Sequence, residues 1–271
     1  MSGTSREPGA EPVSVLGVRV HALRRADLLA WVASTVSSGR RAQIMYANAH
    51  TLNIAYDDSE LRAHMNQADI VYCDGAGVKI AARLLGHRLP ERMTGADWIY
   101  DLCLLCQQEG FSLYFLGGER GVAARAAANL GQRYPGLRIA GAHHGFFERT
   151  GAENARLIAQ INSAQPHILL VGLGTPLQEQ WIAQDFAQLQ AQVIWAVGAL
   201  LDFVADREPR APRWMLDHGL EWLGRLVAEP ERKWRRYLLG NPLFLGRVLK
   251  QKMAPSRPGQ GREFQDDGGR A

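Results

Sequence analysis

Short apolar runs alternate with helix-period segments over most of this chain. Six runs rich in β-branched and aromatic residues predict strands, at 43–48, 69–73, 112–118, 137–145, 167–174 and 192–198. Four segments with apolar residues at helical spacing predict helices, at 26–38, 96–108, 122–134 and 154–163. Strands that alternate with helices favour a mostly parallel sheet covered on both faces, so we expect an α/β, Rossmann-like domain over residues 12–202.

The alternation stops near residue 203, and residues 203–253 have the pattern of helices interrupted by prolines. Residues 206–252 hold eleven Lys and Arg against six Asp and Glu. The net charge is +4, so the rest of the chain is about neutral and the basic character belongs to this appendage. The polar, Gly- and Pro-rich ends, 1–11 and 254–271, predict disordered tails.

Composition argues for an ordinary globular protein. With 271 residues and 46% hydrophobic residues, the chain can bury a large core. It has no long uninterrupted apolar run and no apolar centre of a signal peptide, which predicts a cytoplasmic protein. Cys73, Cys103 and Cys106 lie inside apolar patterns and are expected to be buried thiols.

Asp74 stands where an apolar strand ends and a helix-like pattern begins. It follows residues 69–73 and precedes Gly75 and Gly77. In parallel sheets, ligands bind outside the carboxyl ends of the strands. A carboxylate at that edge can take a proton from a substrate hydroxyl, as a general base does. The alternative is that Asp74 only caps the next helix, because Asp is a favoured N-cap residue.

Asn48 and His50 follow another predicted strand. Asn48 can hydrogen-bond a sugar or a base, or it can cap the helix that starts near Leu52. His50 is a candidate second acid or base, with a structural role as the alternative.

Glycine-rich turns follow two further strands. Gly117 and Gly118 form a G-G-x-x-G pattern, which differs from the dinucleotide fingerprint, and strand 137–145 does not end in the acid that holds an adenine ribose. A phosphate can still approach these glycines closely because they have no Cβ. The pattern therefore argues against an NAD-binding site, and it leaves open a site for another nucleotide.

The turn after strand 167–174 carries further polar residues. Gly174 opens this turn, Pro176 suits the first helical position, and Gln178 and Glu179 are expected to project from the first helical turn toward a ligand. Asp202 lies beyond the last predicted strand.

No D-x-D motif and no spaced His/Cys set is present, so no metal cofactor is expected. The charge of a leaving diphosphate would then be neutralised by arginines of the basic appendage.

Taken together, "YANAHTLNIA", "CDGAGVKIAARLLGHRLPERMTGADW", "FLGGERGVA", "GLGTPLQEQW" and "GALLDF" with the downstream "RAPRWM" and "GLEWLGRLVAEPERKWRRY" resemble the WecG/TagA/CpsF family of bacterial glycosyltransferases. The likeness covers roughly residues 14–240. It implies an inverting, metal-independent enzyme that moves N-acetylmannosamine, its uronic acid or a hexose from a UDP-sugar to a polyprenyl-diphosphate-linked glycan. Such enzymes serve the synthesis of wall teichoic acid, enterobacterial common antigen or other exopolysaccharides.

The resemblance also assigns roles. It places the catalytic base on Asp74, active-site positions on Arg92 and Gln178, and donor contacts on Asn48 and Asp202. Three appendage arginines are implied to close over the diphosphate and to bring the enzyme to the membrane. The predicted substrate-binding set is Asn48, Gly75, Arg92, Thr94, Gly118, Gly174, Gln178, Glu179, Asp202, Arg225, Arg232 and Arg235. Tyr46 departs from the smaller residue common in the family, which leaves the donor sugar open.

The expected partners are the UDP-sugar, the lipid-linked acceptor and the membrane surface, with no nucleic acid and with homo-oligomerisation left open. The protein is expected to be peripheral on the inner face of the cytoplasmic membrane. Residues 243–252 predict a basic amphipathic helix that contacts the membrane or packs on the protein itself. The alternatives in function are a nucleotide-dependent oxidoreductase or epimerase, and a non-catalytic basic binding module.

Overall fold

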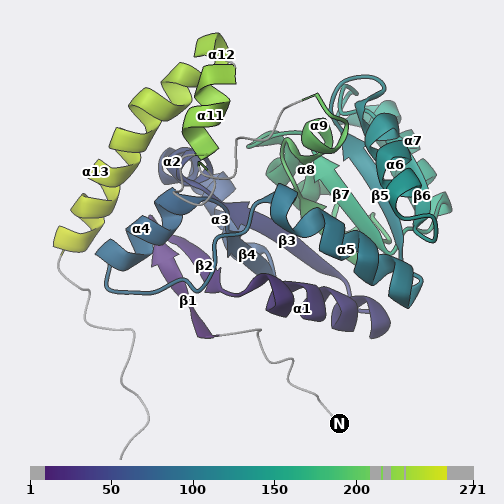
Figure 1. Cartoon of the computed structure of the whole chain (residues 1–271), viewed down its shortest axis with the longest axis horizontal. Coiled ribbons are helices and arrows are strands. Elements are labelled where there is room, and N and C mark those ends of the chain that lie inside the picture. Colours follow the sequence, from purple (N-terminus) through teal and green to yellow (C-terminus); the bar gives the residue numbers. More distant parts are fainter. Residues whose placement is uncertain (1–9, 208–214, 216–220, 229, 255–271) are drawn as a thin grey trace, which may run out of the picture.

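A mostly parallel sheet forms the centre of the molecule (Figure 1). The computed structural model describes residues 10–207, 215, 221–228 and 230–254. Within them the strand order is β1-β2-β4-β3-β8-β7-β5-β6, with β1 antiparallel to β2 and every other neighbouring pair parallel. The strands are β1 (Ala10–Val15), β2 (Val18–Ala22), β3 (Ala42–Ala47), β4 (Ile70–Cys73), β5 (Ser112–Gly117), β6 (Arg138–His143), β7 (Ile168–Gly172) and β8 (Val193–Ala196). The predicted α/β fold is confirmed.

The first two strands were missed by the sequence interpretation. They form a hairpin whose turn, Leu16 and Gly17, has positive φ at both residues. Buried valines alternate along both strands, which is the period-2 signal of a strand. Ala10 and Glu11 belong to β1, so the predicted tail at 1–11 was wrong at these two positions. The other residues of that tail, and residues 255–271, lie outside the described residues.

Helices cover both faces of the sheet. The helices of the α/β body are α1 (Arg25–Ser37), α2 (Ala49–Asp57), α3 (Ser59–Gln67), α4 (Ala76–Leu84), α5 (Gly95–Glu109), α6 (Val122–Arg133), α7 (Gly151–Ser163), α8 (Leu177–Asp185) and α9 (Leu200–Val204). Residues of α2, α3, α4, α7 and α8 share one buried core, and residues of α1, α5, α6 and α9 share the other. Met45 and Ala47 of β3 face the first core, and Ile44 and Tyr46 face the second, as strand alternation requires.

An aromatic stack supports the ends of β3 and β4. Trp98 of α5 stacks on Trp195 of β8, with ring centroids 4.1 Å apart, and Tyr72 meets Trp195 edge-on at 6.1 Å. Tyr46 lies 6.3 Å from Tyr72. Offset and edge-on aromatic pairs stabilise beyond the area they bury. The stack therefore fixes the two strand ends that precede Asn48 and Asp74.

The C-terminal segment is helical in its described part, with α11 (Glu221–Ala228), α12 (Pro230–Trp234), a π-helical turn η1 (Arg235–Leu239) and α13 (Gly240–Met253). The predicted boundary between residues 202 and 203 falls inside α9. Pro242 has no N–H to give to the carbonyl of Leu238, which accounts for a loosened turn directly before it.

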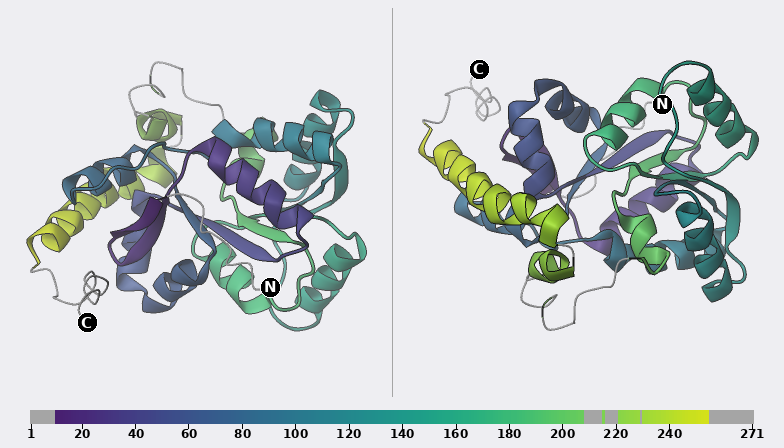
Figure 2. Two further views of the ribbon diagram at one scale, coloured as in Figure 1. Left: turned by 90° about the horizontal axis from the view of Figure 1, so that it is seen from below. Right: turned by 90° about the horizontal axis from the view of Figure 1, so that it is seen from above.

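Helix α13 lies against the α/β body beside α2 and α4 (Figure 2). Phe244 and Val248, one turn apart, are buried in the core that α2 and α4 share. Leu243 and Leu249 are exposed. The amphipathic helix predicted at 243–252 therefore packs on the protein with one face and leaves apolar residues on another.

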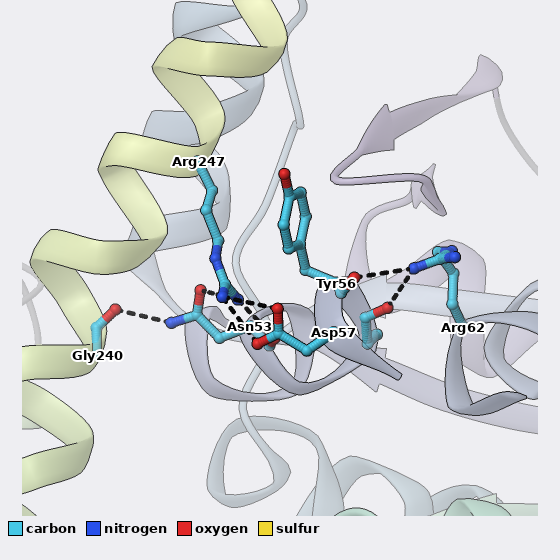
Figure 3. A network of polar contacts seen from close by, with 7 residues as sticks. Asn53, Tyr56, Asp57, Arg62, Gly240 and Arg247 are labelled. Carbon is cyan, nitrogen blue, oxygen red and sulfur yellow. Dashed lines mark hydrogen bonds and ion pairs between the residues drawn. The ribbon is translucent and has the colours of Figure 1, made fainter. Parts of the chain in front are cut away.

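Arg247 fastens α13 to α2 (Figure 3). Its guanidinium donates to both carboxylate oxygens of Asp57, at 2.9 and 2.7 Å, and to the backbone carbonyl of Asn53 at 2.7 Å. It also lies over the ring of Tyr56, 4.4 Å from the centroid. The side chain of Asn53 donates to the carbonyl of Gly240 at 2.8 Å. We call these five residues the α2–α13 clamp. Residues 243–252 were expected either to contact the membrane or to pack on the protein, and Arg247 belongs to the packing contact.

Breaking the clamp should loosen α13 while the α/β body stays folded. Arg247→Ala removes a bidentate ion pair and a cation–π contact, together worth about 1–2 kcal/mol at a partly exposed site. We therefore expect amide hydrogen exchange within residues 240–253 to speed up by about tenfold, measured by mass spectrometry. Lys250→Ala on the same helix is the control, and equal exchange in the two variants would contradict the role of the clamp.

Candidate active site

Two cavities lie along the carboxyl edge of the sheet. The first, the Asp74 cavity, measures about 340 Å³ and lies where β3 and β4 end. The second, the glycine cavity, measures about 770 Å³ and lies at the turns that follow β5 to β8. Among the predicted site residues, Asn48, Asp74, Gly75, Arg92 and Thr94 line the Asp74 cavity, and Gly118, Gly174 and Asp202 line the glycine cavity. Parallel strands bring these chain-distant residues to one edge.

Asp74 sits at the wall of the first cavity, half-buried. Its backbone N–H donates to the carbonyl of Ala47 at 2.8 Å, which continues the β3–β4 ladder by one residue. Its carboxylate accepts a hydrogen bond from the side-chain amide of Asn48 at 3.0 Å. Gly75, with φ of +105°, is the N-cap of α4, so Asp74 lies one residue before the cap position. The carboxylate faces a cavity and can accept a proton there.

Asn48 has the capping role considered for it and makes a second contact that the sequence did not suggest. Its Oδ1 accepts hydrogen bonds from the backbone N–H groups of His50 and Thr51, both at 3.0 Å, so it caps α2. Its amide nitrogen is thereby turned toward Asp74. Asn48 therefore orients the carboxylate, and it also lines the cavity.

His50 lines the same cavity as a neutral group. Burial, and then the positive charge of Arg236, lower the pKa of His50 to about 4. Near neutral pH this imidazole is uncharged, so it cannot act as a general acid. It can offer a hydrogen bond to a sugar hydroxyl.

Arg92 and Thr94 reach the cavity on a segment tied to β4. The backbone N–H of Met93 donates to the carbonyl of Cys73 at 2.8 Å, which holds this segment beside the strand end. Thr94 is the N-cap of α5, and its hydroxyl donates to Asp97 at 2.9 Å. Arg92 is half-buried at the cavity wall and contributes a positive charge.

Close backbone packing accounts for two glycines beside the second cavity, Gly117 and Gly172. A Cβ on Gly117 would lie 2.3 Å from the carbonyl oxygen of Gly172, and one on Gly172 would lie 2.7 Å from that of Gly198. A side chain at either position would therefore collide with the backbone of the neighbouring turn. Asp202 lies 3.9 Å from Arg207, which also pairs with Glu119 at 2.8 Å. Phe146 lines the cavity with 66% of its surface exposed.

Gln178 and Glu179 line neither cavity. Both are fully buried, whereas the sequence suggested that they project toward a ligand. Gln178 donates to the hydroxyl of Tyr46 at 3.1 Å and accepts from the backbone N–H of Gly198 at 3.0 Å. Glu179 accepts from Gln178 at 2.8 Å and from Thr175 at 2.9 Å. This buried network joins the end of β3 to the turn after β8, between the two cavities. Pro176 takes the N-cap position of α8, one residue earlier than expected.

The arginine that the appendage contributes to a cavity is not one of the three that were expected there. Arg235 is exposed, with its guanidinium 5.3 Å from the Trp234 ring centroid, and lines neither cavity. The side chains of Arg225 and Arg232 lie outside the described residues. Arg236 lines the Asp74 cavity, with several other residues that sequence reasoning missed: Ile80, Trp222, Tyr237, Asn241, Phe244 and Leu245.

The expectation of buried, unpaired thiols is confirmed for all three cysteines. Burial raises the pKa of Cys73 to about 12. In the described part of the chain, no three His, Cys, Asp or Glu residues come together as a metal site would require. None of the helices described there combines the length and apolar composition of a membrane span.

Comparison with known proteins gives consistent matches over most of the chain. Residues 13–258 match the model of the glycosyl transferase WecG/TagA/CpsF family. A Staphylococcus aureus (strain MRSA252) protein named N-acetylglucosaminyldiphosphoundecaprenol N-acetyl-beta-D-mannosaminyltransferase is 29% identical over 77% of this chain and 80% of its own length. A protein of the same name from Bacillus spizizenii is 28% identical over 82% of this chain and 84% of its own length.

The burial of the Glu179 carboxyl leads to a prediction of how the free energy of unfolding depends on pH. Burial raises its pKa above the ordinary value, so the folded state holds the proton more tightly than the unfolded chain. Its stabilising contribution is complete below the unfolded pKa and is lost as the pH rises through the folded pKa. As the pH rises above the ordinary carboxyl pKa, the wild type should therefore lose free energy of unfolding relative to Glu179→Gln, measured by urea denaturation over a pH series. Glu109→Gln, at an exposed site, should follow the wild type; parallel pH profiles for all three would contradict the assignment.

Proposed function

This chain belongs to the WecG/TagA/CpsF family of glycosyltransferases, and we propose that it transfers an N-acetylmannosamine-like sugar from a UDP-sugar to a polyprenyl-diphosphate-linked glycan. The names of the two relatives support both the sugar and the lipid-linked acceptor. Family membership sets aside the oxidoreductase and the non-catalytic binding module that sequence patterns alone left open.

The observation that carries the proposal is the placement of Asp74. Its carboxylate is oriented by Asn48 and borders a cavity, beside a second cavity along the same sheet edge. A transferase that joins two substrates needs a space for each and a base that reaches the acceptor hydroxyl. We assign the acceptor to the Asp74 cavity and the nucleoside of the donor to the larger glycine cavity, where the Asp202 carboxylate can accept hydrogen bonds from ribose hydroxyls.

The reaction then takes one displacement. Asp74 removes the proton from the acceptor hydroxyl, whose oxygen attacks the anomeric carbon of the donor sugar from the face opposite UDP. The bond from that carbon to the β-phosphate oxygen breaks, UDP leaves, and the configuration inverts. Arg92, together with Arg225 and Arg232 of the appendage as the sequence predicts, stabilises the charge of the leaving diphosphate without a metal ion. Full activity in the presence of EDTA is the outcome expected from this assignment.

The appendage is our candidate for contact with the membrane, at the inner face of the cytoplasmic membrane. Leu238, Leu239 and Leu243 are each about half exposed, and Met253 at the end of α13 is more so. Lys250 and Lys252 are exposed near that end. Apolar side chains together with lysines suit the interface of a membrane that contains anionic lipid.

Asp74→Asn tests the base. The amide keeps the shape of the side chain and an oxygen that can accept from Asn48, but it cannot take up the proton. We expect turnover to fall on the order of a hundredfold or more. The melting temperature and the affinity for UDP should stay near those of the wild type. Asp69→Asn, at the amino end of the same strand, should transfer sugar normally. An Asp74→Asn enzyme with normal turnover would refute the proposed mechanism.

Membrane contact is tested by charge reversal. Each lysine near an anionic surface contributes about 1 kcal/mol of attraction, so Lys250→Glu with Lys252→Glu should lower binding to phosphatidylglycerol-containing vesicles at least about tenfold. Cosedimentation measures the bound fraction. Arg40→Glu with Arg125→Glu, two exposed sites on the α/β body, provides the matched control. Equal loss in both double variants would indicate a general charge effect and no role for α13.

A further inference from the structure

Arg236 projects from the π-helical turn η1 into the Asp74 cavity. Its Nε is buried and has no hydrogen-bond partner among the described residues. A buried guanidinium N–H without a partner is costly, and in native proteins it commonly marks a place that a ligand or water completes. Its neighbour Arg235 points to solvent and lies over Trp234. The structure therefore distinguishes two adjacent arginines that the sequence does not.

The side chains that line the two cavities give them net charges of opposite sign. The Asp74 cavity has Arg92 and Arg236 against Asp74 alone, since His50 is neutral near pH 7. The glycine cavity has Arg149 and Arg207 against four acids, Glu119, Glu148, Glu153 and Asp202. An anionic group is therefore favoured in the Asp74 cavity.

The start of α4 adds to this preference. Gly75, Ala76 and Gly77 line the Asp74 cavity, and Gly75, the N-cap of this nine-residue helix, has no side chain that could cap it. The first backbone N–H groups of a helix favour anions, and phosphate oxygens in particular. Two arginines and a helix N-terminus thus surround the same space.

An apolar wall borders this cationic space. Ile80, Trp222, Phe244 and Leu245 line the cavity beside Arg236. Ile80 is 48% exposed, so this wall opens toward solvent. Leu245 belongs to α13, the helix that also exposes Leu243 and Leu249. A group that joins a diphosphate directly to an isoprenoid chain fits this juxtaposition, whereas a nucleoside diphosphate would place a polar ribose against these side chains.

We propose that Arg236 binds the diphosphate of the lipid-linked acceptor, and that Ile80, Trp222 and Leu245 receive its first isoprene unit. This assignment rests on the proposed function and adds to it the residue and the wall that recognise the acceptor. The α2–α13 clamp holds the helix that follows Arg236, so docking of the appendage completes the acceptor site.

The test compares Arg236→Gln with the wild type in steady-state kinetics, using a soluble short-chain isoprenyl-diphosphate-linked acceptor. We expect the KM for this acceptor to rise at least about tenfold, because charge-assisted hydrogen bonds to phosphate are lost. The KM for the UDP-sugar should change less than about twofold. Arg236→Lys should recover part of the loss, and Arg83→Gln, which removes an exposed charge from α4, should match the wild type.

A binding measurement avoids dependence on turnover. Farnesyl diphosphate should raise the melting temperature of the wild type, farnesol should raise it less, and Arg236→Gln should abolish the difference between the two ligands. UDP should stabilise both proteins equally. The melting temperature without ligand shows whether the variant is folded.

Three outcomes would overturn the proposal. The first is a loss of UDP affinity in Arg236→Gln with an unchanged acceptor KM, which would assign the arginine to the donor diphosphate. The second is an Arg235→Gln effect on the acceptor KM as large as that of Arg236→Gln. The third is no effect of Arg236→Gln on either substrate. Failure of the proposed function is a separate result, because the wild type itself would then transfer no sugar.

Discussion

The hydrogen bond from Asn48 to Asp74 is the contact on which the site depends. Ala47 and Cys73 are paired in the parallel ladder of β3 and β4, so the next residue on each strand leaves the sheet side by side. Asn48 must cap α2 with its oxygen, which leaves its nitrogen for the carboxylate. One amide thus fixes the start of a helix and the direction of the proposed base.

Helix α2 connects the proposed base to the appendage. Its first residue follows Asn48, and its later turns supply Asn53, Tyr56 and Asp57 to the clamp on α13. The residue that aims Asp74 and the residues that seat the appendage therefore belong to one short rigid element. A shift of α13 along α2 would move Phe244 and Leu245 relative to Asp74. The dimensions of the Asp74 cavity are consequently set by the same contacts that hold the appendage in place.

Sequence reasoning found the sheet and the polar residues at the strand ends, because parallel topology sends every carboxyl end to one edge. It missed features that depend on the direction of a side chain. Gln178 and Glu179 lie in the first turn of α8 as expected, but both side chains are buried in the interior. Helical spacing does not show which of Arg235 and Arg236 faces the cavity, because the π-helical turn changes the angle between successive side chains there. The catalytic and binding roles themselves stay predictions.

The two faces of α13 suggest how a lipid-linked substrate could reach the Asp74 cavity while its lipid stays in the membrane. Phe244 and Val248, four residues apart, bind the helix to the core, and this leaves the opposite face for Leu243 and Leu249. Phe244 of the buried face lines the Asp74 cavity, and so does Leu245, which lies one turn before the exposed Leu249. The proposed acceptor site therefore borders the exposed side of the helix. A substrate whose lipid stays in the membrane needs only its diphosphate and sugar to pass the edge of α13. On the proposed function, the helix that attaches the protein to the bilayer is also the one that sets the depth to which the acceptor enters.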